Sequence, residues 1–196
     1  MFITQKKRFS LLLLLAGLFV LVGSFLISGC ATALKAPATL DPAVSKPQVI
    51  VNPDSISLGV AALTGTKIVF EGSGFKPGDS VFITLIGANE IKEAVADGKV
   101  QADGKFTAPV GTLAKVVGIL RGTVSGETAK DGSYNQFIVI TQPPIPAGVY
   151  TARATSMLTD KTAETKLTIE EPSFGEKVKD WLGGMLGKIV DKRPTK

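Results

Sequence analysis

The side chains that most often perform chemistry are scarce in this sequence, whose 196 residues include no histidine and one cysteine, Cys30. Histidine is the commonest general base and the commonest zinc ligand, so Ser-His and Cys-His catalysis cannot be assembled. Cys30 also has no second cysteine with which to form an intramolecular disulfide. Modification of its thiol by a group from outside the chain is the chemistry that remains.

Two other arrangements have a spacing that can support chemistry, but their surroundings do not fit. Ser73 and Lys76 are spaced like a Ser-Lys dyad, yet they lie in a block of Gly and Pro that is typical of a turn. The sequence GGMLGK at 183–188 is too short for a phosphate-binding loop and has no strand before it. We expect neither arrangement to be functional.

Four aspartates stand at predicted turns, where carboxylates and nearby carbonyl groups could hold calcium. The sequence has no D-x-D-x-D-G loop, and Asp is a common turn former in its own right, so turn formation is the favoured interpretation. We therefore predict a protein that is not an enzyme and that binds no metal and no cofactor. The four residues are Asp79, Asp97, Asp103 and Asp131.

The sequence before Cys30 is typical of an export signal. Lys6, Lys7 and Arg8 precede a run without charge over residues 9–29. Positive charges stay on the cytoplasmic side of a membrane, so the chain that follows the run is expected to emerge on the opposite side.

Ile27, Ser28 and Gly29 stand immediately before Cys30 and resemble the lipobox of bacterial lipoproteins. The resemblance implies recognition of these residues by signal peptidase II, cleavage before Cys30, and a diacylglyceryl thioether on its sulfur, with acyl chains such as palmitate. Two acyl chains anchor a protein stably, whereas one is marginal. The alternatives are an uncleaved transmembrane anchor, because about 21 apolar residues can span a bilayer, and a secreted protein with an incidental cysteine.

Most of the apparent basicity belongs to this N-terminal segment. The chain has 22 Lys and Arg against 17 Asp and Glu, for a net charge of +5. Residues 1–29 hold three of the basic residues and no acid, so the rest of the chain has 19 basic and 17 acidic residues, a balance of +2. This balance gives no case for nucleic-acid binding. We expect an extracytoplasmic protein, held to the cell membrane or the outer membrane by the lipid on Cys30.

After Cys30, the Ala/Pro-rich sequence to residue 47 has no periodicity, which predicts a spacer or a disordered leader over 30–47. From 48 to 171, short apolar stretches alternate with turn signals, which predicts an all-β sandwich. The strands are expected at 48–52, 55–58, 67–71, 80–86, 91–96, 105–109, 136–141, 148–156 and 162–170.

Three segments resemble bacterial immunoglobulin-like and IPT/TIG-type envelope modules: GSGFKPGDSV at 72–81, DGKF at 103–106 and PAGVYTARA at 146–154. The resemblance implies an immunoglobulin-like β-sandwich. Tyr150 matches the corner tyrosine of such domains, whose hydroxyl bonds to backbone upstream. Residues 111–135 depart from the resemblance and predict an insertion with a short helix or an extra strand.

Residues 173–191 have the periodicity of an amphipathic helix, with Ser173 and Glu176 placed to form a capping box. Such a helix can dock on the sandwich, lie in a membrane interface or bind another protein, and the sequence leaves these three alternatives open. The apolar residues expected to contact a membrane or partner are Phe174, Trp181, Leu182, Met185, Leu186 and Ile189.

Together these features predict a non-enzymatic lipoprotein that presents an immunoglobulin-like module at the cell envelope for adhesion, assembly or ligand binding. Its expected partners are the membrane, through the N-terminal lipid, and an envelope protein or a polysaccharide, with no nucleic acid among them. The alternative is an accessory subunit of an envelope transport or secretion complex that docks through its C-terminal helix.

Overall fold

A computed structural model describes residues 36–88 and 90–193 of the chain. The chain divides into two units, Met1–Ala36 and Pro37–Lys196, and the architecture below is that of the second unit. The lipobox residues Ile27, Ser28, Gly29 and Cys30 lie outside the described residues.

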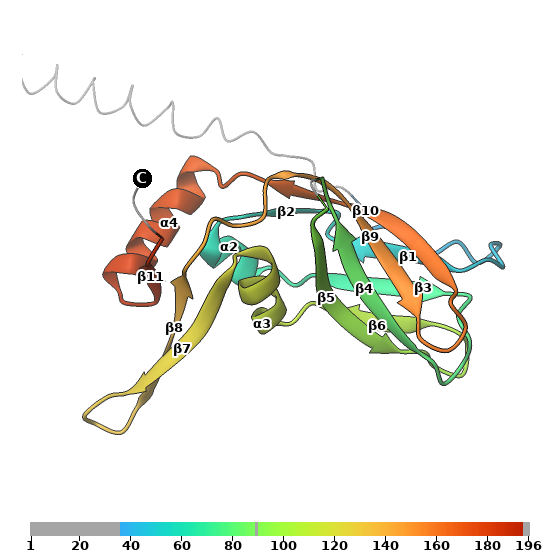
Figure 1. Ribbon diagram of the computed structural model, residues 1–196, viewed down its shortest axis with the longest axis horizontal. Coiled ribbons are helices and arrows are strands. Elements are labelled where there is room, and N and C mark those ends of the chain that lie inside the picture. Colours follow the sequence, from blue (N-terminus) through green and yellow to red (C-terminus); the bar gives the residue numbers. More distant parts are fainter. Residues whose placement is uncertain (1–35, 89, 194–196) are drawn as a thin grey trace, which may run out of the picture. The chain divides into compact units, whose positions relative to one another are not determined.

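Two β-sheets carry most of the described fold (Figure 1). The first sheet has the strand order β1-β3-β6, and the second has the order β2-β10-β9-β4-β5. This agrees with the all-β class that the turn spacing predicts. The first sheet comprises β1 (Gln48–Asn52), β3 (Val69–Ser73) and β6 (Phe106–Pro109); the second comprises β2 (Ser55–Ser57), β10 (Thr162–Glu170), β9 (Gly148–Ser156), β4 (Ser80–Ile86) and β5 (Lys92–Lys99).

The chain passes from one sheet to the other at Pro53. Strand β1 pairs antiparallel with β3 in the first sheet, and the peptide bond between Asn52 and Pro53 is cis. Strand β2 then pairs parallel with β10 in the second sheet, with Ile56 opposite Ile169. Because proline has no N–H to donate to a β-ladder, the pairing with β3 ends there and the next residues are available to the other sheet.

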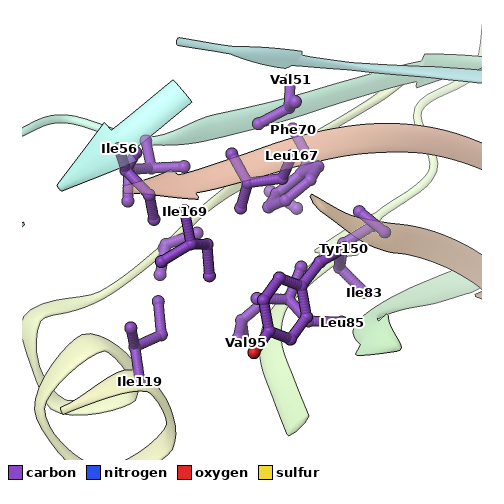
Figure 2. Close-up of a cluster of buried hydrophobic side chains, with 14 of the residues drawn as sticks. Val51, Ile56, Phe70, Ile83, Leu85, Val95, Ile119, Tyr150, Leu167 and Ile169 are labelled. Carbon is purple, nitrogen blue, oxygen red and sulfur yellow. The ribbon is translucent and has the colours of Figure 1, made fainter. Parts of the chain in front are cut away.

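The core lies between these sheets and follows the alternation of each strand (Figure 2). Tyr150, Ala152 and Ala154 of β9 point inward and are buried, as their spacing predicts. The Tyr150 hydroxyl donates a 2.8 Å hydrogen bond to the Pro146 carbonyl oxygen, which confirms the corner interaction expected from the sequence. Ala152 is almost fully buried and packs within the core cluster.

Strand β4 lies in the interior of its sheet, between β9 and β5. Its sequence, VFITLI at 81–86, is apolar on nearly both faces, but only one face is fully buried. Val81, Ile83 and Leu85 are fully buried, but Phe82 on the opposite face is 42% exposed. One face of this sheet therefore packs on the core and the other contacts solvent, as is common for antiparallel sheets.

Several predicted strand boundaries are wrong, among them that of the strand expected at 67–71, because β3 covers Val69–Ser73. The pair Asp97 and Gly98, expected to form a turn, lies inside β5, where it continues the ladder opposite Phe82 and Val81 of β4. The strand expected at 136–141 is β8 (Tyr134–Ile140), which belongs to neither sheet of the sandwich. A ladder to a neighbouring strand thus overrides a local turn signal.

A third sheet is formed by the insertion and the C-terminal residues. The segment between β6 and β9 contains both of the alternatives that the sequence allows, a short helical stretch and an extra strand, and its sheet has the order β11-β8-β7. Strand β11 pairs parallel with β8, so the end of the described chain returns to the insertion. The elements are α3 (Thr112–Ala114), the π-helical stretch η1 (Lys115–Ile119), β7 (Gly122–Thr128) and β11 (Ile189–Asp191).

The C-terminal helix is shorter than the predicted span of 173–191. Helix α4 covers Phe174–Met185, and Gly187 follows with a φ of 67°. Glycine adopts this left-handed conformation at no steric cost and commonly ends helices in this way. The chain then reverses into β11, so that Ile189 belongs to a strand rather than to the helix. No helix among the described residues is long and apolar enough to cross a bilayer.

The residues before β1 that the structure describes are bound to the sandwich. The Ala38 N–H donates to the Asn52 side-chain oxygen at 2.8 Å, and the Asn52 amide donates back to the Ala38 carbonyl at 3.0 Å. The Gln48 side chain makes the same kind of reciprocal pair with the backbone of Asp41. The part of the predicted spacer between these residues and β1 therefore lies along the domain instead of extending freely from it.

Asp79 joins the start of β4 to the turn after β9. Its carboxylate is buried and accepts hydrogen bonds from the Ser156 hydroxyl, from the Ser80 N–H at 2.6 Å and from the Leu158 N–H at 3.2 Å. The Ser156 hydrogen bond, helped by the backbone N–H groups and opposed by burial, lowers the pKa of Asp79 below the usual 3.8. The carboxylate therefore stabilises the fold in its charged form.

The stability of the domain should fall with pH through the titration of Asp79. Because the folded-state pKa lies below the unfolded value of 3.8, the stabilisation is complete above that pH and is lost as the pH falls through the folded-state pKa. Urea denaturation of Asp79→Asn should show lower stability than the parent at neutral pH, and the difference should shrink below about pH 4. The matched control Asp97→Asn makes the same change at an exposed position of β5 and should be as stable as the parent at neutral pH. A constant difference for Asp79→Asn at all pH values would contradict this account.

Candidate functional site

The short helix α2 (Val60–Gly65) has its first N–H groups bound by a side chain from the C-terminal helix. The two carboxylate oxygens of Asp180 accept hydrogen bonds from Val60 N–H and Ala61 N–H, both at 2.8 Å. The residue at the N-cap of α2 is Gly59, which has no side chain to satisfy these groups. Because the first N–H groups of a helix have no partner within it, Asp180 supplies the cap and fixes α4 against the end of the sandwich.

The other end of α2 is bound by a lysine from the insertion. The Lys115 ammonium, on η1, donates to the carbonyl oxygens of Thr64, at 3.5 Å, and Thr66. Lys115 is only 4% exposed, and this burial lowers its pKa below the usual 10.5. A cation is favourable at the C-terminal end of a helix, where carbonyl groups are left without partners. Helix α2 therefore links the insertion to α4.

A second polar contact holds the start of α4. The Glu176 carboxylate accepts from the Ser57 hydroxyl at 2.9 Å and from the Ser173 N–H at 2.7 Å. The Glu176 N–H donates in turn to the Ser173 hydroxyl at 3.3 Å, which confirms the predicted capping box. Burial alone would raise the pKa of Glu176, but the hydrogen bonds from Ser173 and Ser57 outweigh it and the pKa lies below 4.5.

The apolar residues of α4 do not take part in this docking. No residue of the helix is buried, and Phe174 and Trp181 are 83% and 62% exposed. Of the three alternatives left open by the sequence, docking on the sandwich therefore occurs, but through Glu176 and Asp180. The predicted contact residues that stay exposed are Phe174, Trp181, Leu182 and Met185 on α4 and Leu186 at its C-cap.

Ile189 differs from the other predicted contact residues. It lies in β11 opposite Ile138 of β8 and is half-buried against the core. A Cβ on Gly183 of α4 would lie 2.7 Å from the Ile189 Cδ1 atom, so the glycine lets the strand approach the helix. Helical spacing grouped Ile189 with the face of α4, but the reversal at Gly187 places it on a different element.

An open groove of about 990 Å³ lies between α4, β11 and the facing end of the sandwich. Its walls are mostly apolar, and the charged groups along it include the Asp191–Arg193 ion pair. This volume is near the upper end of the range of ligand pockets, which are typically apolar with few polar groups. The residues that line it are Leu58, Val60, Leu120, Ile140, Pro143, Pro144, Ile145, Pro146, Glu171, Pro172, Lys177, Asp180, Trp181, Gly184, Met185, Ile189, Asp191 and Arg193.

Three of the residues predicted to contact a membrane or partner, Trp181, Met185 and Ile189, line this groove, whereas Phe174, Leu182 and Leu186 do not. Sequence reasoning missed the opposite wall. Pro143 and Pro144 lie between the strands expected at 136–141 and 148–156, and nothing in the sequence places Leu58 or Leu120 beside the C-terminal helix. A proline-rich segment between a hairpin and a core strand can place apolar side chains at the edge of a domain. Only the fold shows that this segment faces α4 across the groove.

The predicted chemical motifs do not come together at the groove. The groove contains apolar side chains, backbone and a few charges, and Ser73 and Lys76, the pair with dyad spacing, lie away from it at the end of β3 and in the following turn. Within residues 36–88 and 90–193, no group of three acidic, His or Cys side chains gathers as metal ligands would.

Comparison with known proteins gives only distant similarities. No family model and no curated protein matches the chain. Macromomycin is 18% identical over 63% of this chain and 99% of its own, with a TM-score of 0.36. A bacterial immunoglobulin-like domain from the ice-binding adhesin of M. primoryensis is 15% identical over 65% of this chain and 100% of its own, with a TM-score of 0.31.

Replacement of Asp180 by alanine should loosen α4 without unfolding the sandwich. The change removes both hydrogen bonds to the start of α2, and loss of a helix cap costs about 0.5–2 kcal/mol. Chymotrypsin should therefore cut faster at Phe174 and Trp181, which already are exposed. Lys179→Ala, on the same helix but outside the contact, is the matched control and should leave the cleavage rate unchanged. Equal cleavage of Asp180→Ala and the parent would contradict the docking role.

Proposed function

We propose that this chain is a lipid-anchored extracytoplasmic protein whose immunoglobulin-like sandwich presents a non-enzymatic binding site in the groove beside α4. The observation that carries the proposal is the groove itself. It has about 990 Å³ of open space with mostly apolar walls, and Asp180, which lines it, also caps α2.

The order of the strands supports the immunoglobulin-like part of the proposal. Immunoglobulin domains place strands A, B and E in one sheet and strands G, F and C side by side in the other. The orders β1-β3-β6 and β10-β9-β4 follow the same arrangement. The hydrogen bond from Tyr150 to Pro146 lies at the start of β9, where the corner tyrosine of that fold is found.

The N-terminal sequence supports export and anchoring. A basic cluster at 6–8, an uncharged run over 9–29 and the Ile27-Ser28-Gly29-Cys30 sequence have the order of a lipoprotein signal. A lipid on Cys30 would hold the sandwich at the cell membrane or the outer membrane. The net charge of the remaining chain, close to neutral, gives no support to a nucleic-acid partner.

The groove walls favour an apolar segment of an envelope protein over a polysaccharide. Sugars need hydroxyl partners along their length, and the walls formed by Leu120, Ile140 and Pro143–Pro146 offer few. An apolar segment would instead displace water from these side chains, which favours binding in proportion to the area covered.

A second candidate is an accessory subunit of an envelope complex that docks through α4. The specific observation in its favour is the outward face of the helix, where Phe174 and Leu186 are exposed at 83% and 74%. Apolar patches left exposed on a folded domain often mark interaction sites.

The anchor is tested by replacing Cys30. In cells, Cys30→Ala should abolish lipid attachment and leave the signal uncleaved, since the cysteine is the modified residue in the lipobox resemblance. Intact mass of the detergent-extracted parent should show residues 1–29 absent and acyl chains present. A parent mass that retains residues 1–29 would overturn the lipoprotein proposal, and so would a Cys30→Ala protein with the same processing as the parent.

The groove is tested by filling it from α4. A Cβ on Gly184 would meet only the Ile189 carbonyl oxygen, at 3.7 Å, so Gly184→Leu can project into the groove without backbone strain. Binding of the hydrophobic dye 1-anilinonaphthalene-8-sulfonate, followed by its fluorescence, should weaken roughly tenfold, which corresponds to the loss of about 1.4 kcal/mol.

Gly175→Leu is the matched control, because it adds the same side chain to the same helix at a position that does not line the groove and has no atom within 4 Å of its Cβ. Unchanged dye binding by Gly184→Leu, with circular dichroism spectra equal to the parent, would show that the groove is not the binding site.

A further inference from the structure

The outward face of α4 is a continuous apolar stripe. Phe174, Val178, Trp181 and Met185 follow one another at steps of four, three and four residues, which places them on one side of a helix with 3.6 residues per turn. Leu182 and Leu186 broaden this stripe along one edge. The outward stripe is defined here as these six residues.

The outward stripe lies away from the residues that dock the helix. Glu176 and Asp180, four residues apart, share the opposite side of α4 and bind Ser57 and the first N–H groups of α2. Because the docking contacts use only that side, the stripe remains exposed although α4 is fixed to the domain. A helix held in place in this way has already lost its conformational freedom, so a surface that binds it need not supply the free energy of folding it.

No other element among the described residues exposes as many large apolar side chains. Elsewhere they occur singly or in pairs, as with Leu113 and Val117 of the insertion and Met157 and Leu158 in one turn. Scattered apolar side chains are usual on protein surfaces, whereas a gathered set marks a site of contact.

The charges beside the outward stripe are mainly basic. Lys177 and Lys179 flank it on its two sides, and Lys188 follows the helix. The acids of the same region are engaged within the protein: Glu176 and Asp180 in docking, and Asp191 in its ion pair with Arg193. Among the acids that make none of these contacts, Glu171 is the nearest to α4 in sequence and stands one turn before it.

The apolar stripe and its flanking lysines together favour a membrane over a protein as the surface that contacts α4. Helices that lie in a bilayer surface have lysines beside an apolar face that contains Trp, Phe and Leu, and Lys177 and Lys179 stand beside the outward stripe in this way. We propose that the outward stripe of α4 lies in the headgroup region of an anionic membrane, with Lys177 and Lys179 at the lipid phosphates and Trp181 at the boundary. This contact goes beyond the proposed function, because it needs neither the lipid on Cys30 nor an occupied groove.

The experiment uses the chain from residue 37 to 196. This unit contains every residue of the buried core, and the uncharged run at 9–29, which would bind vesicles by itself, is absent from it. Vesicles of phosphatidylcholine alone are compared with vesicles of equal parts phosphatidylglycerol and phosphatidylcholine. Co-sedimentation should show binding to the anionic vesicles and little to the neutral ones. The fluorescence of Trp181, the single tryptophan, should shift to shorter wavelength and be quenched by brominated lipid.

Two sets of variants test the charge and the stripe separately. Lys177→Glu and Lys179→Glu should each weaken binding to the anionic vesicles by roughly fivefold or more, the factor expected for one basic residue at such a surface. The matched controls are Lys92→Glu and Lys166→Glu, which make the same change at exposed positions in β5 and β10, and they should bind close to the parent. Phe174→Ser combined with Leu186→Ser should abolish the shift of Trp181 fluorescence while circular dichroism stays unchanged.

The proposal is overturned if neutral and anionic vesicles bind equally, if the lysine variants behave like their controls, or if Trp181 is not quenched by brominated lipid. Absence of vesicle binding together with a protein that co-purifies in mild detergent and is lost on Phe174→Ser would assign the outward stripe to the accessory-subunit candidate instead. Lys177 also lines the groove, whereas Lys179 does not, so Lys179→Glu separates the membrane contact from the groove, and Gly184→Leu should still bind anionic vesicles.

Discussion

The arrangement of the groove depends on the capping of α2. This helix has only six residues, too few to be stable by itself, and its ends are bound by Asp180 from α4 and Lys115 from the insertion. The opposite charges match the polarity of the helix, with the anion at the N–H groups and the cation at the carbonyl groups. One short helix thus fixes two segments that lie far apart in the sequence, and the groove is the space enclosed between them.

The strands of the sandwich could be predicted because their information is local. Alternation of apolar residues and turn signals placed β1, β4, β9 and β10 at their observed bounds. The hydrogen bond of Tyr150 was expected from the resemblance to immunoglobulin-like modules. Strand β5 extends past its predicted end because the Asp97-Gly98 pair, a turn signal by itself, gains hydrogen bonds from the neighbouring strand. The prediction failed where pairing between strands outweighed local preference.

The groove could not be predicted, because its contacts join residues that are distant in sequence. Asp180 is 120 residues away from Val60, and no periodicity of either segment indicates that they meet. Helix α2 was missed for the same reason, since its caps come from other elements. The end of α4 was misjudged because the helical spacing continues through Ile189, while the conformation that ends the helix depends on the single residue Gly187.

Trp181 and Met185 belong both to the groove wall and to the outward stripe, because they lie where the two surfaces of α4 meet. In the proposed arrangement a membrane that covers the stripe would therefore also border the groove opening. The docking contacts of Asp180 and Glu176 fix the position of α4. Trp181 and Met185 therefore border both surfaces without a change in backbone conformation. A ligand in the groove would contact one side of Trp181 while lipid contacts the other, so the groove and the membrane can be occupied at the same time.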